Sequence, residues 1–256
     1  MKIAVAQMSA VPGDVPGNLR KIDAVAARAA EAGAKLLLTP ELILPGYGAA
    51  KAMAELAEPV DGPQGEALAE IADRHGLAVV AGFAEAADGA VFNSALFTDG
   101  TRAVVYRKSH LYGDYERGLF RPGPPEAATV EHGGLKFGLL ICYDVEFPEN
   151  TRRLARAGVD VVLVPTALPA GASADFIAQR MIPVRAFENQ VFVLYADNCG
   201  ADGRFTYGGQ SHVAAPDGAT LALAGPEAEE LLICEIEPAT YETSRAENTY
   251  LRDLRV

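Results

Sequence analysis

The stretch GLLICYDVEFPE, residues 138–149, decides how this chain is interpreted. It begins as an uninterrupted apolar run, which is typical of a strand buried on both faces of a sheet. The run ends in a cysteine, Cys142, and the acidic residues Asp144, Glu146 and Glu149 follow closely. A strand that simply ends in the core is expected to stop in turn residues. The pattern predicts instead that this strand delivers a thiol to a corner.

Strand and helix patterns alternate on both sides of this stretch, which predicts an α/β fold with mixed sheets covered by helices. Helical spacing predicts four helices, over 18–32, 64–75, 148–157 and 174–188. Apolar or alternating runs predict strands at 2–8, 34–42, 77–86, 91–100, 101–111, 136–142, 159–166, 191–198, 210–218, 219–224 and 231–237. The pair 91–100 and 101–111 is expected to form a hairpin. Because no linker, repeat or low-complexity block interrupts the chain, residues 1–256 are expected to form a single domain.

The charge and the cysteines limit the partners. The chain has 34 acidic and 22 basic residues, a net charge of −12, and no basic cluster, so we expect neither nucleic acid nor an anionic membrane as a partner. No apolar run approaches the roughly 20 residues needed to span a bilayer, and the N-terminus lacks the features of a secretory signal. The three cysteines are widely spaced and form no metal-ligand pattern. We therefore expect a cytoplasmic protein without disulfides or a structural metal.

Three residues that can carry chemistry follow predicted strands: Glu41, Lys108 and Cys142. Side chains at strand ends escape the core but are held on a rigid frame. Each residue taken alone has an ordinary explanation. Cys142 can be a buried small hydrophobe, Glu41 a solvated strand end and Lys108 the exposed end of a hairpin. Together they supply a nucleophile, a proton carrier and a cation for an oxyanion.

The motifs around these residues resemble those of the nitrilase, or carbon–nitrogen hydrolase, superfamily. TPELILPGY resembles its glutamate motif, YRKSHLYGDYERGLFRPG its lysine motif and GLLICYDVEFPE its cysteine motif, in the family's order. The segments IPVRAFENQVFVLYADN, YGGQSHVAAPDG and ENTYLRDLR also agree. The resemblance covers nearly the whole chain and is greatest to the bacterial aliphatic and stereoselective amidases.

This resemblance implies an αββα sandwich that forms a homodimer or a higher homo-oligomer through its helices. It also places Cys142 on a tight corner between a strand, GLLIC, and the helix that starts in FPENTRRLARAG. A helix N-terminus near the thiol is expected to favour the thiolate.

The resemblance also implies a role for each site residue. Cys142 would be the nucleophile and Glu41 the general base. Lys108 would stabilise the oxyanion together with the backbone N–H of Tyr143. Glu116 would hold Lys108 and orient the substrate amide, although a surface charge on a loop is the alternative for this residue.

The reaction implied by these roles is the hydrolysis of an amide through a thioester on Cys142. Glu41 would pass the proton of the thiol to departing ammonia and then activate water. A small-molecule amide and water are the expected partners, and no metal or organic cofactor is expected.

The substrate class is less determined. Family branches that act on carboxylate-bearing substrates typically place an Arg shortly after the cysteine, where this chain has Val145 and Glu146. Like charge would repel a carboxylate near Glu146, which favours primary amides of small neutral or amine-bearing acids. Glu146 could instead point into solvent or cap the next helix. Tyr47 is a candidate pocket wall, and His110 could line the pocket edge or make a structural hydrogen bond.

Three alternatives to an amidase remain from the sequence. A nitrilase uses the same residues, and an N-carbamoylputrescine-type amidohydrolase has a cationic substrate, although the Trp-containing segment that often follows the cysteine in that branch is missing. An alternative of another class is a catalytically silent interaction scaffold. Glu41, Lys108, Glu116 and Cys142 argue against it, because a silent protein would not need all four.

Overall fold

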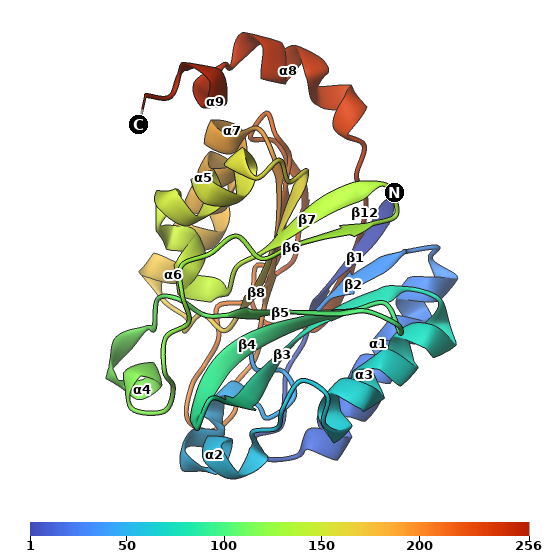
Figure 1. Ribbon diagram of the computed structural model, residues 1–256, viewed down its shortest axis with the longest axis vertical. Coiled ribbons are helices and arrows are strands. Elements are labelled where there is room, and N and C mark those ends of the chain that lie inside the picture. Colours follow the sequence, from blue (N-terminus) through green and yellow to red (C-terminus); the bar gives the residue numbers. More distant parts are fainter. Residues whose placement is uncertain (256) are drawn as a thin grey trace.

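Two six-stranded sheets face each other in the computed structural model, which describes residues 1–255 (Figure 1). Val256, the last residue of the expected domain, lies outside the described part. The strand order is β12-β1-β2-β3-β4-β5 in the first sheet and β11-β10-β9-β8-β7-β6 in the second. The strands of the first sheet are β1 (Lys2–Gln7), β2 (Leu36–Leu38), β3 (Ala78–Ala87), β4 (Ala90–Thr98), β5 (Ala103–Arg107) and β12 (Glu230–Glu235). Those of the second are β6 (Thr129–His132), β7 (Leu135–Leu139), β8 (Val161–Thr166), β9 (Phe192–Asp197), β10 (His212–Ala214) and β11 (Thr220–Leu223).

Helices cover the outer face of each sheet. The first sheet carries α1 (Val15–Glu31) and α3 (Pro63–His75), and the second carries α5 (Pro148–Arg156), α6 (Ala172–Phe176) and α7 (Ile182–Asn189) (Figure 1). Both sheets mix parallel pairs, such as β1 with β2 and β7 with β8, with antiparallel ones. The predicted αββα sandwich with mixed sheets is therefore confirmed.

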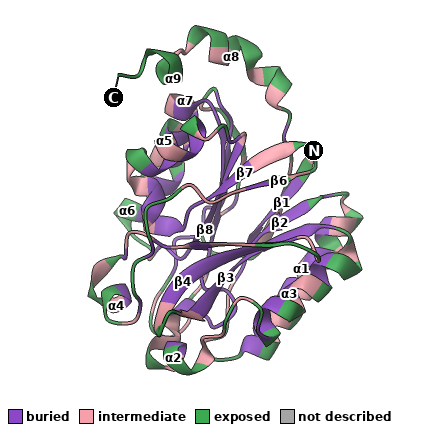
Figure 2. Ribbon diagram, in the orientation of Figure 1, coloured by how far each residue is buried: buried purple, intermediate pink, exposed green. Residues whose placement is uncertain are grey.

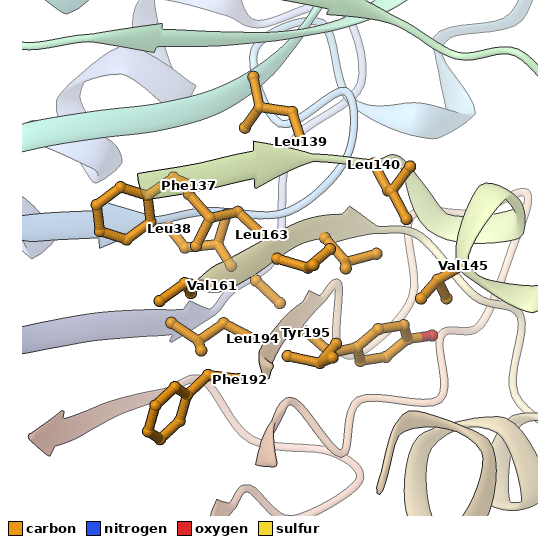
Figure 3. Packing of buried hydrophobic residues seen from close by; sticks show 14 of the residues in the cluster. Leu38, Phe137, Leu139, Leu140, Val145, Val161, Leu163, Phe192, Leu194 and Tyr195 are labelled. Atoms are coloured by element: carbon orange, nitrogen blue, oxygen red, sulfur yellow. The ribbon is translucent and has the colours of Figure 1, made fainter. Parts of the chain in front are cut away.

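Alternation along the strands explains why the layers form. In β1, Ile3 and Val5 belong to the core between the sheets, whereas Ala4 and Ala6 belong to the core under α1 and α3. Successive side chains of a strand point to opposite faces, so one strand supplies both cores. Leu38 of the first sheet meets Phe137 and Leu163 of the second in the inner core (Figure 3). Most strand residues are buried, although β11 and β12 contain no buried residue, and α1, α3, α5 and α7 each bury one face and expose the other (Figure 2).

Several short elements were not predicted. They are a 3₁₀ turn (Tyr47–Ala52), α2 (Met53–Leu56), α4 (Gly113–Arg117), strand β6, a 3₁₀ turn (Pro238–Tyr241), α8 (Glu242–Glu247) and α9 (Tyr250–Asp253). The helical elements among them contain too few turns for helical periodicity to register in a sequence, and β6 has only four residues, too few for a clear alternation. The last three form an arm that extends past the end of the second sheet (Figure 1).

The helix predicted over 174–188 is interrupted. A π turn, Ile177–Met181, separates α6 from α7. The buried His212 explains part of the interruption, because its Nδ1 lies 2.6 Å from the carbonyl oxygen of Ala178 within the turn. π turns commonly occur as single-turn insertions of this kind. No helix within residues 1–255 combines the length and apolarity required to cross a membrane.

Candidate active site

The nucleophile candidate lies on a turn rather than on a strand. The strand predicted to reach Cys142 ends at Leu139, and Cys142 begins a 3₁₀ turn (Cys142–Glu146) that leads into α5. Pairing of β7 with β8 stops at Leu139 because the chain turns away there. Cys142 has φ +44°, in the left-handed region that side-chain-bearing residues seldom adopt. The cysteine is only 6% exposed.

Glu41 follows β2 and is anchored to the second sheet through its backbone. Its N–H donates to the carbonyl of Thr166 over 3.2 Å, and its own carbonyl accepts from Asn198 Nδ2 over 3.2 Å. The next residue, Leu42, has φ +48°. The turn at the end of β2 therefore holds a fully buried carboxylate between the two sheets.

Lys108 lies between two buried carboxylates. Its Nζ is 2.7 Å from Glu41 Oε1 and 2.7 Å from Glu116 Oε1, and all three side chains are almost wholly shielded from solvent. Buried charges of this kind require partners, because desolvation is otherwise too costly. Glu116 is thus not a surface charge on a loop, which was the alternative from the sequence.

Glu116 is fixed by two further donors. The hydroxyl of Tyr47 donates to Oε1 over 2.8 Å, and the backbone N–H of Tyr112 donates to Oε2 over 2.8 Å. Tyr47 is 3% exposed. Its hydroxyl therefore holds Glu116 in place.

Asn93 on β4 belongs to this cluster and was not predicted. Its Nδ2 donates to Glu41 Oε1 over 2.6 Å, and its backbone carbonyl accepts from the N–H of Lys108 over 2.8 Å. The available signal in the sequence was an amide side chain within the largely apolar strand β4. Because Asn93 and Lys108 both bind Oε1, the buried Oε2 of Glu41 is left without a hydrogen-bond partner among residues 1–255.

Burial and the neighbouring charges compete in setting the pKa values of Glu41 and Lys108. Burial raises the pKa of Glu41 to about 7, although the charge of Lys108 acts in the opposite direction. Burial acts to lower the pKa of Lys108, but the charges of Glu116 and Glu41 hold that pKa well above its usual range. At neutral pH the lysine is therefore a cation, and Glu41 can exchange a proton.

The expected thiolate is not favoured. Burial and the charge of Glu41 raise the pKa of the Cys142 thiol well above its usual value, and the charge of Lys108 only partly offsets them. Helix α5 begins at Pro148, beyond the turn that carries the cysteine, so burial outweighs the expected effect of a helix N-terminus. In the described part of the chain, residues 1–255, neither the Glu41 carboxylate nor the Lys108 ammonium forms a hydrogen bond with the Cys142 thiol. Their charges nevertheless act on it.

Tyr143 and Glu146 lie on the same turn as Cys142. The N–H of Tyr143 belongs to the first residues of the turn, which have no acceptor inside it. Glu146 is half-buried, its carboxylate forms no ion pair within residues 1–255, and burial raises its pKa while the charge of Lys108 lowers it. It does not cap α5, because Phe147 is the N-cap residue and that end has no side-chain cap.

His110 makes a structural hydrogen bond. Its Nδ1 lies 2.9 Å from Asp144 Oδ1, and its ring stacks on Phe147 with centroids 4.0 Å apart. Arg185 of α7 supports the turn from the other side, since its guanidinium donates to the carbonyls of Val145 and Glu146 over 2.8 and 2.6 Å. Nowhere in residues 1–255 do three or more His, Cys, Asp or Glu side chains gather in a way that could hold a metal ion.

Comparison with known proteins gives consistent matches. The sequence pattern of the carbon–nitrogen hydrolase family matches residues 2–246. The chain is 44% identical to the "Hydrolase in pqqF 5'region" of Pseudomonas protegens, covering 100% of this chain and 89% of that protein. It is 36% identical to an (R)-stereoselective amidase of a Pseudomonas species, covering 100% and 92%.

Solved structures agree with the sequence relatives. An amidase from a Nesterenkonia species superposes with a TM-score of 0.89 at 35% identity, covering 100% of this chain and 93% of that one. A Glu-to-Gln variant of the Nesterenkonia amidase carries the acetamide moiety of fluoroacetamide, covalently added at its active-site cysteine.

Proposed function

This chain belongs to the carbon–nitrogen hydrolase family, and we propose that it is an amidase that hydrolyses primary amides of small neutral or amine-bearing acids through a thioester on Cys142. The products are the carboxylic acid and ammonia. The proposal also takes residues 1–256 as one domain of the family. The observation that carries the proposal is the buried ion-paired group of Glu41, Lys108 and Glu116, whose charges act on the Cys142 thiol. Buried ionisable groups whose pKa values are strongly shifted cluster at functional sites, which supports a catalytic role for this group.

The first step follows from the two pKa shifts. At neutral pH much of Glu41 is ionised, whereas the thiol keeps its proton. The free Oε2 of Glu41 takes that proton as the sulfur attacks the amide carbonyl carbon. The carbonyl oxygen becomes an oxyanion, which the Lys108 ammonium and the N–H of Tyr143 stabilise.

The second half returns the proton. The Glu41 carboxylic acid protonates the leaving nitrogen, the C–N bond breaks, and ammonia departs from a thioester. Glu41 then takes a proton from water, whose oxygen attacks the thioester carbonyl, and the thiolate regains a proton as the acid leaves. Glu116 keeps the Lys108 ammonium fixed throughout, because it pairs with Nζ at 2.7 Å.

An ammonia-release panel of primary amides, nitriles and N-carbamoyl compounds tests this function. The proposal expects ammonia from primary amides with the greatest kcat/KM. Turnover of nitriles or carbamoyl compounds alone would overturn the assignment as an amidase. No turnover of any compound would favour an interaction scaffold.

Glu146 is the proposed determinant of the amine-bearing substrates. Its half-buried carboxylate has no ion-pair partner within residues 1–255, and the electrostatic influence of Lys108 on it supports a position beside the cluster. Arg185 does not neutralise it by contact, because that guanidinium binds Glu188 and two backbone carbonyls. A carboxylate in this state favours a substrate ammonium and repels a substrate carboxylate.

The variant Glu146→Gln is expected to lower the ratio of kcat/KM for an amine-bearing amide to that for its neutral isostere by about 10-fold or more. The reason is the loss of one charge-assisted contact without a change in side-chain size. Steady-state ammonia release with the two amides measures the ratio. Glu149→Gln is the matched control, because Glu149 is exposed in the first turn of α5. An unchanged ratio in Glu146→Gln would remove Glu146 from substrate selection.

We also propose that the chain forms a homodimer or a higher homo-oligomer through the helices of the second sheet. Phe176 and Val184 on the α6–α7 segment and Tyr250, Leu251 and Leu254 on the C-terminal arm are exposed apolar side chains, which supports a covered face. Such a partner contact would bury them.

Sedimentation velocity tests the oligomer. Val184→Glu is expected to shift the wild-type oligomer toward monomer, because the glutamate would place a charge in an apolar contact. Leu221→Glu on β11 is the control, since Leu221 is also an exposed apolar residue but lies outside these helices. A monomeric wild-type protein would contradict the proposal.

The cytoplasm is the proposed location. Cys142, Cys199 and Cys234 are all free thiols in the structure. Unpaired cysteines are typical of reducing compartments, and an enzyme with a thiol nucleophile needs one that stays reduced.

A further inference from the structure

Asp144 lies two residues after the proposed nucleophile and is fully buried. Its carboxylate accepts several hydrogen bonds from protein donors. Oδ1 accepts from the Ser109 hydroxyl and the His110 backbone N–H, both over 2.8 Å. Oδ2 accepts from the Tyr106 hydroxyl over 3.0 Å and, more weakly, from the Ile141 N–H over 3.4 Å.

The donors come from the two segments that carry Lys108 and Cys142. Ser109 and His110 directly follow Lys108, and Ile141 directly precedes Cys142. One carboxylate therefore connects the end of β5, in the first sheet, to the turn after β7, in the second. No strand pairing joins β5 and β7, since the two strands belong to different sheets.

The backbone of Asp144 is tied to α5 as well. The Asn150 side chain donates to the Asp144 backbone carbonyl over 2.9 Å, and its Nδ2 lies 3.1 Å from His110 Nδ1. His110 in turn lies between Asp144 and the Phe147 ring. The turn that carries the thiol is thus fixed from the lysine side and from the helix side.

We propose that Asp144 is a positioning residue that fixes the Lys108 ammonium relative to the Cys142 sulfur, an inference that rests on the proposed amidase function and deepens it. It does not touch the reacting atoms. Both groups must meet one carbonyl, the sulfur at carbon and the ammonium near oxygen, so their separation sets the reaction geometry. A displacement of about 1 Å at such a site can cost about 100-fold in rate.

An aspartate suits this position because both of its carboxylate oxygens can accept hydrogen bonds. Its two oxygens provide about four lone-pair sites, whereas an asparagine of the same size provides one acceptor oxygen and an NH₂ group. In Asp144→Asn the amide oxygen can still accept from Ser109 and His110. The NH₂ group then takes the place of Oδ2 and faces the Ile141 N–H, so two donors meet. The buried N–H is left unpaired, and the turn is expected to shift.

The test compares Asp144→Asn with Asp160→Asn. Asp160 is a matched control, because its carboxylate also accepts a hydrogen bond from a backbone N–H, that of Lys136 over 2.9 Å. Asp160 directly precedes β8 and belongs neither to the turn that carries Cys142 nor to the segment that carries Lys108. Asp144→Asn is expected to lower kcat about 100-fold at nearly unchanged KM. Asp160→Asn is expected to keep the wild-type kcat and KM. Thermal unfolding of both variants establishes that folded protein is compared.

Wild-type kcat in folded Asp144→Asn, or a rise in KM without a fall in kcat, would overturn the proposal. If that variant does not fold, the double variant Tyr106→Phe/Ser109→Ala removes one donor from each oxygen without burying a new unpaired group. It is expected to lower kcat about 10-fold, and an unchanged kcat would overturn the proposal in the same way. Failure here would leave acylation of Cys142 intact, whereas failure of the proposed function would abolish acylation in the wild type as well.

Discussion

The variant Cys142→Ala is expected to lower kcat for a primary amide by about 10⁵-fold or more, as for the loss of other enzymatic nucleophiles. Without the sulfur no covalent intermediate can form, and the remaining Glu41 and Lys108 can only act on water. Steady-state ammonia release with the purified variant measures the loss.

Cys199→Ala and Cys234→Ala are the matched controls for the nucleophile. Cys199 is as buried as Cys142, and burial raises its pKa to about 11. Neither control residue takes part in the ion-paired cluster of Glu41, Lys108 and Glu116. Both variants should keep wild-type kcat. If Cys142→Ala turned over at the wild-type rate, the thiol would have no catalytic role.

The variant Glu41→Gln is expected to lower kcat/KM by about 10²- to 10⁴-fold, the usual contribution of a general base. The amide of glutamine cannot accept the thiol proton, and the raised pKa of Cys142 means that little thiolate forms without a base. In the wild type, kcat/KM should rise as the pH increases through about 7, because Glu41 must lose its proton before it can act as a base. This limb should disappear in Glu41→Gln.

Glu85→Gln is the control for the general base. Glu85 is buried and pairs with Arg107 at 2.7 Å, so its replacement also removes a buried charge. It should leave the pH limb near 7 in place. A wild-type pH limb in Glu41→Gln would assign the ionisation to another group and contradict the role of Glu41.

The fold was predictable wherever a periodic pattern ran over a whole element. Strands β4 and β5 form the hairpin predicted at 91–111, because alternation and the turn at Asp99 and Gly100 both mark it. Helices α1 and α3 also lie within a few residues of their predictions. The π turn at Ile177–Met181 was not predictable, since its contact with His212 joins residues 34 positions apart.

The site was predictable in part, for a related reason. The ends of predicted strands at 41, 108 and 142 indicated three candidate residues, and the structure pairs Glu41 with Lys108 directly. Asn93 was not predictable, because its proximity to Lys108 depends on the register of β4 against β5, in which Ser94 pairs with Arg107. The expectation that a helix N-terminus favours the Cys142 thiolate is wrong, because burial by distant segments raises the pKa of the thiol and outweighs the local turn.

The most direct test of the thioester is mass spectrometry of the enzyme quenched during turnover of a slow primary amide. The account predicts a mass increase equal to the amide minus ammonia, which proteolytic mapping assigns to the peptide that contains Cys142. The increase should persist in Cys199→Ala and vanish in Cys142→Ala. Turnover without any adduct in the wild type under conditions that accumulate an intermediate, or an adduct on another residue, would contradict the account.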